Sequence, residues 1–461
     1  MELEAMLQSQ RDYFAAGNTL PPFARVEMLK KLRDEIRRSE AEIAAALQAD
    51  LNKCGAESYM TEIGMVLDEL GCLIKNTARW AKPKRARTPL AQFAAKSYVV
   101  QQPYGCTLIM APWNYPFLLS MSPLAGAVSA GNCVVLKPSA YAPHTSSMMA
   151  QLCARVFPPE WVSVVEGGRK ENNALLDQKF DYIFFTGSVG VGKLVMEKAA
   201  RHLTPVSLEL GGKSPVVVDA SANIPLAAKR IAFGKLLNAG QTCVAPDYVL
   251  VHESVREELV RQLEHQFRQM LGEAPLQAND FVRIVNGKHF ARLQGILAGC
   301  TILCGGNSKA DEVSGSGWIE PTLVADTLKA ESPAMAEEIF GPILPIIPVE
   351  DIEQAVQFIN ARPHPLALYL FTETDAVRRM VLDRCSFGGG CVNDTIIHLA
   401  THQMPFGGVG DSGMGGYHGR SSFDTFTHQK SIVDKATWLD LPMRYRPYSA
   451  ANQKLIRMFL K

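Results

Sequence analysis

Three side chains in separate segments of the 461-residue chain could together carry nucleophilic chemistry. Cys243 ends the turn Gly240–Cys243, and a cysteine thiolate attacks carbonyl carbons. Glu209 precedes two glycines at a predicted strand end, where a carboxylate can activate water as a general base. Asn114 ends another predicted strand, and its amide can donate to an oxyanion. Singly these fit a buried cysteine, a surface glutamate and a turn-former; together, at strand ends, they predict one crevice.

Two glycine-rich segments are similar to phosphate-binding loops. Phe185–Lys193 follows a predicted strand and opens a helix, so its backbone can approach a phosphate. Its spacing nearly matches the P-loop, but Leu194 replaces the Ser or Thr that would hold magnesium, which excludes an ATPase. Gly408–Gly413 fits the GxGxxG pattern without a βαβ unit around it. We interpret that second segment as a surface turn, with a phosphate loop as the alternative.

The ten cysteines predict packing and a single reactive thiol rather than a metal site. No CxxC pair occurs, and no matching Cys or His pair follows Cys300 and Cys304. Several others, such as Cys133, lie in apolar runs where cysteine behaves as a small hydrophobe. A chain of this size needs no disulfides for its core. We therefore expect reduced thiols, no metal and a cytoplasmic location.

Charge and hydropathy exclude other classes of partner. Lys plus Arg is 47 and Asp plus Glu is 46, so the net charge is +1, and we expect no nucleic-acid binding. The N-terminus lacks a secretory pattern. No apolar run approaches the roughly 18 residues of a membrane span, so we expect no membrane partner.

Alternating strands and helices predict an α/β fold with a doubly wound parallel sheet. Helices are expected over 21–50 and 56–81, followed by a solvated, proline-marked break at 82–87. The first unit has predicted strands at 105–110, 133–137, 161–165 and 182–185, with predicted helices at 117–130, 143–156 and 189–202. From about residue 208 the pattern restarts. The second unit has predicted strands at 206–210, 215–218 and 248–251, with predicted helices at 224–237, 254–270 and 351–360. The last sixty residues show little periodicity.

Seven segments, in order across nearly the whole chain, resemble the motifs of the aldehyde dehydrogenase superfamily. They are Ala111–Pro116, Lys137–Ser139, Phe185–Gly192, Glu209–Lys213, Gly240–Cys243, Glu337–Pro342 and Pro405–Gly408. Tyr417–Gly419, Phe423–Phe426 and the short N-terminal part look most like the class 3 branch, which acts on fatty or aromatic aldehydes. The resemblance implies an NAD(P)-binding domain of residues 1–81 and 101–207 and an α/β catalytic domain of residues 208–398. The segments 82–100 and 399–461 would bridge subunits, and class 3 relatives look like homodimers.

The resemblance also implies roles for the three side chains. Cys243 would attack the aldehyde, and Asn114 with the Cys243 backbone N–H would hold the oxyanion. Hydride loss would leave a thioester, and Glu209 would activate the water that releases the carboxylic acid. Family members that pass the acyl group to coenzyme A lack this glutamate, so its presence favours hydrolysis.

Cofactor and substrate residues follow from the same resemblance. The residues implied to bind NAD or NADP are Trp113, Lys137, Gly187, Ser188, Gly190, Gly192, Glu338 and Phe340. Members that prefer NAD often carry Glu three residues after the lysine; here Ala140 stands there, so we predict use of NADP as well. Val189 replaces a common Thr in the glycine segment. Tyr115 and Leu119 are expected to line a channel for medium-chain aliphatic or aromatic aldehydes, with ordinary core packing as the alternative.

Two other functions remain as alternatives. A cofactor-independent thiol hydrolase or acyltransferase would need a histidine beside Cys243, and none of the ten histidines has a telling position. A non-catalytic binding protein would be expected to have lost Cys243, Glu209 or Asn114, and all three are present.

Overall fold

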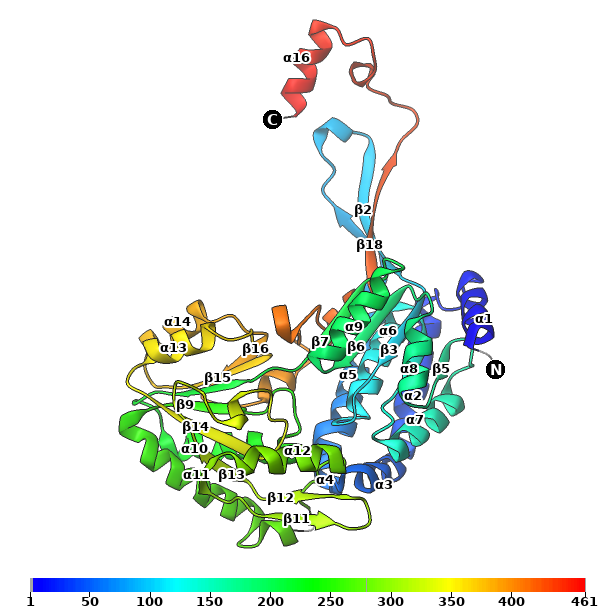
Figure 1. The fold of residues 1–461 in the computed structure, drawn as a ribbon. Coiled ribbons are helices and arrows are strands. Elements are labelled where there is room, and N and C mark those ends of the chain that lie inside the picture. The colour runs from blue at the N-terminus through cyan, green and yellow to red at the C-terminus, as the bar shows by residue number, and fades with distance from the viewer. Residues whose placement is uncertain (1–2, 279, 461) are drawn as a thin grey trace.

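The computed structural model describes residues 3–278 and 280–460, which form two α/β bodies and a projecting arm (Figure 1). The first body contains a six-stranded sheet in the order β17-β7-β6-β3-β4-β5. Its parallel strands are β3 (Cys106–Met110), β4 (Cys133–Lys137), β5 (Val162–Val164), β6 (Tyr182–Gly187) and β7 (Val206–Leu210). The short β17 (Gly413–Met414) joins its edge antiparallel to β7.

Helices cover both faces of this sheet because successive strand residues point to opposite sides. Leu108 and Met110 of β3 belong to a core that is shared with α1 (Leu3–Ala15), α8 (Arg169–Leu176) and α9 (Val189–Ala200). Ile109, between them, packs in the larger core on the other face. The helices of that face are α2 (Pro22–Arg38), α3 (Glu40–Leu51), α5 (Gly64–Trp80), α6 (Leu118–Ala130) and α7 (Pro143–Val156).

The second body holds a seven-stranded sheet in the order β10-β13-β14-β9-β8-β15-β16. The strands are β8 (Pro215–Val218), β9 (Tyr248–His252), β10 (Thr301–Cys304), β13 (Thr322–Ala325), β14 (Ile343–Val349), β15 (Ala367–Phe371) and β16 (Gly389–Val392), and all but β10 are parallel. The helices of this body are α10 (Ile224–Leu236), α11 (Arg256–Leu271), α12 (Gly287–Ala298), α13 (Ile352–Asn360) and α14 (Asp375–Arg384). A hairpin of β11 (Ser308–Asp311) and β12 (Ser316–Ile319) lies beside them.

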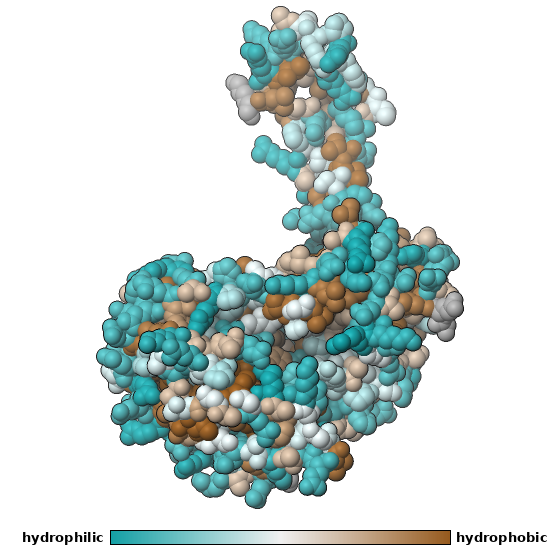
Figure 2. Space-filling model, in the orientation of Figure 1, coloured by the Kyte–Doolittle hydropathy of each residue, from teal (hydrophilic) through white to brown (hydrophobic). Residues whose placement is uncertain are grey.

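The arm is a three-stranded antiparallel sheet that extends away from both bodies (Figure 1). It is built from β1 (Lys84–Ala86), β2 (Ala95–Pro103) and β18 (Thr427–Lys435), and α16 (Ala450–Phe459) lies at its far end. The short α15 (Arg420–Thr425) precedes β18. Hydrophobic residues are exposed along the arm (Figure 2), among them Val433 and Trp438.

Most predicted elements of the two units are present within one or two residues, and four predictions need correction. The strand 206–210 pairs with β6 in the first sheet, not in the second unit, because strand partners are set by tertiary packing. The break at 82–87 contains β1, which is exposed as expected but paired to β2. The predicted helix 21–50 is two helices that meet at Ser39. The C-terminal segment, expected to be irregular, contains α15, β18 and α16.

Candidate active site

The nucleophile turn, residues 238–243, carries the predicted nucleophile Cys243 and follows the end of α10. Asn238 and Ala239 have φ of 53° and 52°, and Gly240 follows with φ of 72°, so three consecutive residues are left-handed. A Cβ on Gly240 would stand 2.3 Å from the carbonyl oxygen of Gly341, so only glycine fits at this position. A left-handed conformation costs about 1–2 kcal/mol for an ordinary residue. The turn that presents Cys243 is therefore strained and needs support from its surroundings.

The side chain of Gln241 provides part of that support. Its Nε2 donates to the carbonyl oxygens of Asn238 and Arg283, both at 3.1 Å, and its Oε1 accepts from the Val285 amide at 3.0 Å. Gln241 has no exposed surface, so these bonds are made away from water and fix the turn.

The thiol of Cys243 lies at the surface of a cavity and faces two carboxylates. Burial raises the pKa of Cys243 to about 12, and the charges of Glu338 and Glu209 contribute in the same direction. Hydrogen bonds to the sulfur from the backbone amides of Cys243 and Val244 oppose this rise in pKa. The thiol is thus protonated near neutral pH in this state.

Asn114 lies against the nucleophile turn. Its side-chain Nδ2 donates to the carbonyl oxygen of Gln241 at 3.0 Å, which leaves its second N–H for another acceptor. Its own carbonyl oxygen accepts from Asn238 Nδ2 at 2.8 Å. The neighbouring Tyr115 hydroxyl is 2.7 Å from the Thr242 hydroxyl. Hydrogen bonds from side chains to backbone and between side chains therefore join the segment after β3 to the segment after α10.

Glu209 is a buried carboxylate on β7, opposite Gly413 of β17. Neither of its oxygens has a hydrogen-bond partner among the described residues, and burial raises its pKa well above the usual range. A Cβ on Gly407 would lie 3.2 Å from Glu209 Oε1, so a glycine there leaves space beside the carboxylate. An unpartnered buried carboxylate with a raised pKa is suited to take a proton from water.

An apolar cavity of about 190 Å³ reaches Cys243. Tyr115 and Leu119, the expected channel residues, both line it. The remaining lining residues include Met65, Phe233, Leu237, Ile396, Phe406 and Tyr417. The cavity can therefore take an apolar group whose reactive end meets the thiol.

The expected cofactor residues near the thiol come together around an aromatic pair. The ring centroids of Trp113 and Phe340 are 5.3 Å apart, edge to face. Burial and the charge of Asp247 raise the pKa of Glu338 to about 8, and its Oε1 has no partner among the described residues. A Cβ on Gly211 would lie 2.1 Å from Glu338 Oε2, so a side chain there would displace the Glu338 carboxylate. An orphaned acceptor of this kind fits a ribose hydroxyl.

The other expected cofactor residues lie at the carboxyl ends of β4 and β6. Lys137 Nζ donates to the carbonyl oxygens of Pro138 at 2.7 Å and Gly167 at 2.6 Å, and burial lowers its pKa. A Cβ on Gly187 would meet the Phe185 ring at 2.5 Å, and one on Gly192 would meet Leu210 at 2.6 Å. Gly190 and Ser188, at the start of α9, are exposed, and so is Ala140. This edge can take a dinucleotide backbone.

The arrangement of the two sheets explains why the predicted catalytic and cofactor residues come together. Asn114, Lys137 and Gly187 come at or after the ends of first-sheet strands, as ligand residues of parallel sheets do. Cys243 and Glu338 instead precede the second-sheet strands β9 and β14. The carboxyl edge of one sheet thus faces the amino edge of the other, and the cavity lies between them.

Other features considered from the sequence do not contribute to this site. In the part of the chain that the structure describes, no group of three or more His, Cys, Asp or Glu side chains could hold a metal ion. No described helix is long and apolar enough to cross a membrane. Gly408–Gly413 forms a short 3-10 turn and β17, with no following helix of a βαβ unit.

Sequence patterns did not indicate the residues that hold the site together. Lys53, Glu57 and Glu62 contact the segments of Asn114 and Asn238, and Gln241 belongs to the Gly240–Cys243 motif without a predicted role of its own. Glu57 and Glu62 are five residues apart, a spacing that matches no α-helical or strand period, because residues 59–63 are a π-helical turn. A lysine near two glutamates is the only signal that could have pointed to them.

Comparison with known proteins agrees with this geometry. The model of the aldehyde dehydrogenase family matches residues 1–432. The 4,4'-diaponeurosporen-aldehyde dehydrogenase of Staphylococcus aureus is 46% identical over all of this chain and 99% of that protein. Aldehyde dehydrogenase family 3 member B1 of Mus musculus is 42% identical over 98% of this chain and 96% of that protein.

Solved structures give the same result. The substrate-bound state of Staphylococcus aureus AldH superposes with a TM-score of 0.96 at 45% identity and covers both chains fully. An indole-3-acetaldehyde dehydrogenase in complex with NAD+ has a TM-score of 0.85 at 26% identity, over 94% of this chain and 88% of that one. The chain belongs to the aldehyde dehydrogenase family and is similar throughout to members of family 3. It is an enzyme that oxidises aldehydes.

Proposed function

We propose that Cys243 is the nucleophile of this oxidation. The observation that carries the proposal is that the apolar cavity reaches the Cys243 thiol. The carboxylate of Glu209 is close enough for its charge to raise the pKa of that thiol. The thiolate adds to the aldehyde carbon and gives a thiohemiacetal. The proton of the thiol must first pass to water, because the pKa of about 12 leaves little thiolate at neutral pH.

The oxyanion of that intermediate is held by two donors. One is the second side-chain N–H of Asn114, whose first N–H is bonded to Gln241, and the other is the backbone N–H of Cys243. One donor of this kind contributes about 2.7–4 kcal/mol to the transition state. Because the first bond of Asn114 is made within the protein, its amide plane is fixed before substrate binds.

Glu209 acts after the thioester has formed. Once Glu209 is ionised, its unpartnered carboxylate takes a proton from water, the water oxygen adds to the thioester carbon, and the bond to Cys243 breaks. The carboxylic acid leaves and the thiol takes up the proton. The raised pKa of the buried Glu209 makes it a stronger base than an exposed glutamate.

The cofactor is NAD or NADP, whose nicotinamide supplies the acceptor for the hydride that the thiohemiacetal carbon loses. Lys137 would hold the adenine ribose, and Gly187, Ser188, Gly190 and Gly192 would lie along the pyrophosphate. Trp113, Glu338 and Phe340 would take the nicotinamide ribose end. The orphaned Oε1 of Glu338 and the exposed start of α9 support this assignment. The exposed Ala140 leaves space for a 2′-phosphate, so both dinucleotides are used.

The substrates are medium- or long-chain aliphatic or aromatic aldehydes. The lining of the cavity is almost wholly apolar and includes Tyr115 and Leu119, which favours such groups. The Staphylococcus aureus relative named above bears the name of a 4,4'-diaponeurosporen-aldehyde dehydrogenase, which is in keeping with an apolar substrate.

The assembly is a homodimer formed through the arm. A projecting sheet with Val433, Trp438 and other apolar side chains in solvent is a typical surface for a second copy. The cytoplasmic location stays a prediction from the cysteine content, and the ten cysteines are free thiols in the structure.

A cofactor-independent thiol hydrolase is disfavoured by the state of the histidine that lines the same cavity as the thiol. His418 lines the same cavity, but its ring is bonded to the backbone of Leu399 and Thr401, and burial lowers its pKa to about 4. It is therefore a poor base for Cys243. A non-catalytic binding role is disfavoured because Cys243, Glu209 and Asn114 are all present and lie close together. Cys243 lines the cavity, Asn114 bonds to the turn that carries it, and the charge of Glu209 raises its pKa.

The deciding experiment mixes the purified protein with NAD or NADP and an aldehyde such as hexanal or benzaldehyde and follows absorbance of the reduced cofactor. We expect reduced cofactor with the native chain and none with Cys243→Ala. Full activity of Cys243→Ala, or no activity of the native chain with any aldehyde, would contradict the proposal.

A further inference from the structure

A buried ion pair outside the cavity contacts the segment that carries Asn114. Lys53 Nζ and Glu62 Oε1 are 2.6 Å apart, and neither side chain has any exposed surface. Taking two charges out of water is costly, and apolar side chains of similar size often stabilise a protein as well or better. The pair is therefore weak evidence for stability, and its other contacts indicate what it does.

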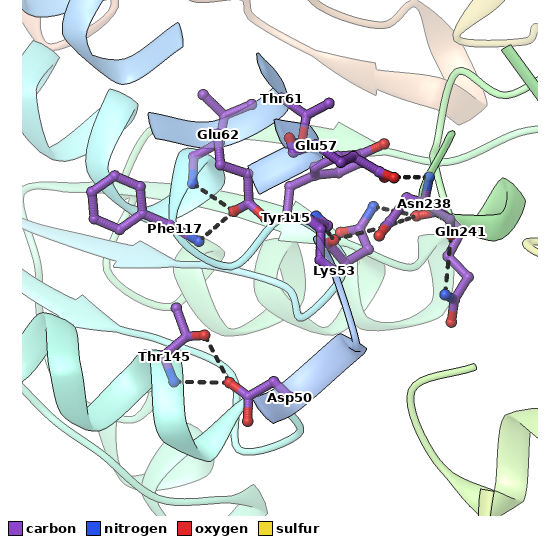
Figure 3. A network of polar contacts seen from close by, with 12 residues as sticks. Asp50, Lys53, Glu57, Thr61, Glu62, Tyr115, Phe117, Thr145, Asn238 and Gln241 are labelled. Atoms are coloured by element: carbon purple, nitrogen blue, oxygen red, sulfur yellow. Dashed lines mark hydrogen bonds and ion pairs between the residues drawn. The ribbon is translucent and has the colours of Figure 1, made fainter. Parts of the chain in front are cut away.

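Those contacts are all made to residues 114–118. Lys53 Nζ lies 4.3 Å from the centre of the Tyr115 ring and 3.5 Å from the carbonyl oxygen of Asn114. Glu62 Oε2 accepts from the backbone amides of Phe117 at 2.9 Å and Leu118 at 3.2 Å, which are orphan donors at the start of α6. One ion pair thus holds both ends of residues 114–118, which are called the oxyanion segment because they carry Asn114 (Figure 3).

A second carboxylate, that of Glu57 between Lys53 and Glu62 in the chain, holds the nucleophile turn. Glu57 Oε1 accepts from the Asn238 backbone amide at 2.8 Å, at the first of the three left-handed residues. Asn238 in turn donates from Nδ2 to the carbonyl oxygens of Asn114 and Gln241. Figure 3 shows these bonds running from Glu57 through Asn238 toward Gln241.

We propose that Lys53, Glu57 and Glu62 are positioning residues that set the Asn114 amide against the Cys243 turn for attack on the aldehyde. The inference rests on the roles proposed for Asn114 and Cys243. None of the three side chains lines the cavity, so they act through the residues they hold. A displacement of about 1 Å in such a site can cost about a hundredfold in rate.

The first test compares Glu57→Ala with Glu57→Gln. The measured quantity is the rate of the pre-steady-state burst of reduced cofactor, which reports the first turnover. Gln keeps an oxygen acceptor for the Asn238 amide, whereas Ala removes it. We expect Glu57→Ala to slow the burst by about 10- to 100-fold, with Glu57→Gln within about threefold of native and the KM for NAD unchanged in both. Equal, native burst rates in both variants would overturn the role of Glu57.

A double-mutant cycle shows whether Glu57 acts through the oxyanion segment. If it does, Glu57→Ala in an Asn114→Ala background slows the burst much less than it does alone. Fully multiplicative effects would overturn the proposed coupling. A native rate for Asn114→Ala alone would instead sink the oxyanion role itself, so the two failures are distinguishable.

The ion pair is tested by replacing both charges, because removing one would leave the other buried and uncompensated. We expect Lys53→Met/Glu62→Met to keep a cooperative melting transition but to slow the burst by about tenfold or more. The matched control is the exposed pair Glu264 and Arg268 on α11, 2.7 Å apart, whose double Met variant should keep the native burst. A folded Lys53→Met/Glu62→Met enzyme with the native burst rate would refute the role of the pair.

Discussion

The side-chain amide of Asn114 donates to the backbone carbonyl oxygen of Gln241 at 3.0 Å, although 127 residues separate them in the sequence. This bond joins the loop after β3 to the turn after α10. Because Gln241 stands two residues before Cys243, the bond fixes the proposed oxyanion donor, Asn114, relative to the proposed nucleophile, Cys243. The chemistry of the site therefore depends on a contact between two bodies of the chain.

Replacing Glu209 with Gln should separate the two halves of the reaction. The thioester still forms, but no base of raised pKa activates water, so we expect a burst of about one reduced cofactor per subunit and steady-state turnover about a hundredfold lower. Rapid-mixing absorbance measures both phases. Native steady-state turnover in Glu209→Gln would show that another group is the base.

The reactivity of Cys243 in the cofactor-free enzyme should depend steeply on pH. With a pKa of about 12, the thiolate fraction rises with pH and grows by about tenfold per pH unit between pH 7 and pH 9. The rate of alkylation by iodoacetamide, followed by mass spectrometry of the Cys243 peptide, measures this rise. A rate that levels off below pH 9 would mean that the thiol ionises in the ordinary range.

Cofactor preference should change at position 140. Ala140→Glu places a carboxylate near the end of β4, where it repels a 2′-phosphate and accepts from a ribose hydroxyl. We expect kcat/KM for NADP to fall by about tenfold or more, with that for NAD kept. Ala140→Gln, which adds no charge, serves as the control and should still use NADP. An unchanged ratio in Ala140→Glu would place the adenine ribose elsewhere.

The size of the cavity should limit the length of the substrate. Leu119→Phe adds volume to the lining of a cavity of about 190 Å³, so long aldehydes are hindered while short ones still reach Cys243. We expect kcat/KM for dodecanal to fall by about tenfold, with acetaldehyde changed less than about twofold. The short aldehyde is the internal control. Equal losses for both aldehydes would indicate a disturbed fold.

Assembly should depend on the apolar surface of the arm. Val433 of β18 is 51% exposed, and Val433→Asp places a charge where a second copy is proposed to pack. We expect light scattering to show a dimer for the native chain and a monomer for this variant. Val313→Asp, at a position 98% exposed on the β11–β12 hairpin, should stay dimeric. A monomeric native chain would overturn the arm as the dimer surface.

The sequence by itself determined the chemical groups and most elements of the first body, whereas five strands of the second sheet, β10, β13, β14, β15 and β16, were not predicted. Cys243, Glu209 and Asn114 could be named because their types carry defined chemistry, and the strand-and-helix alternation indicated parallel sheets. Motif order added the family, which the comparisons confirmed. Such signals are local, since each depends on residues close together in the chain.

Only the tertiary structure decided how these groups meet. The strand 206–210 reads the same whether it pairs with β6 or β8, and only packing placed it, with Glu209, in the first sheet. The left-handed turn at Asn238 and the ion pair of Lys53 with Glu62 have no periodic signal either. They depend on contacts between residues far apart in sequence, whose partners are set by the packing of the two bodies against one another.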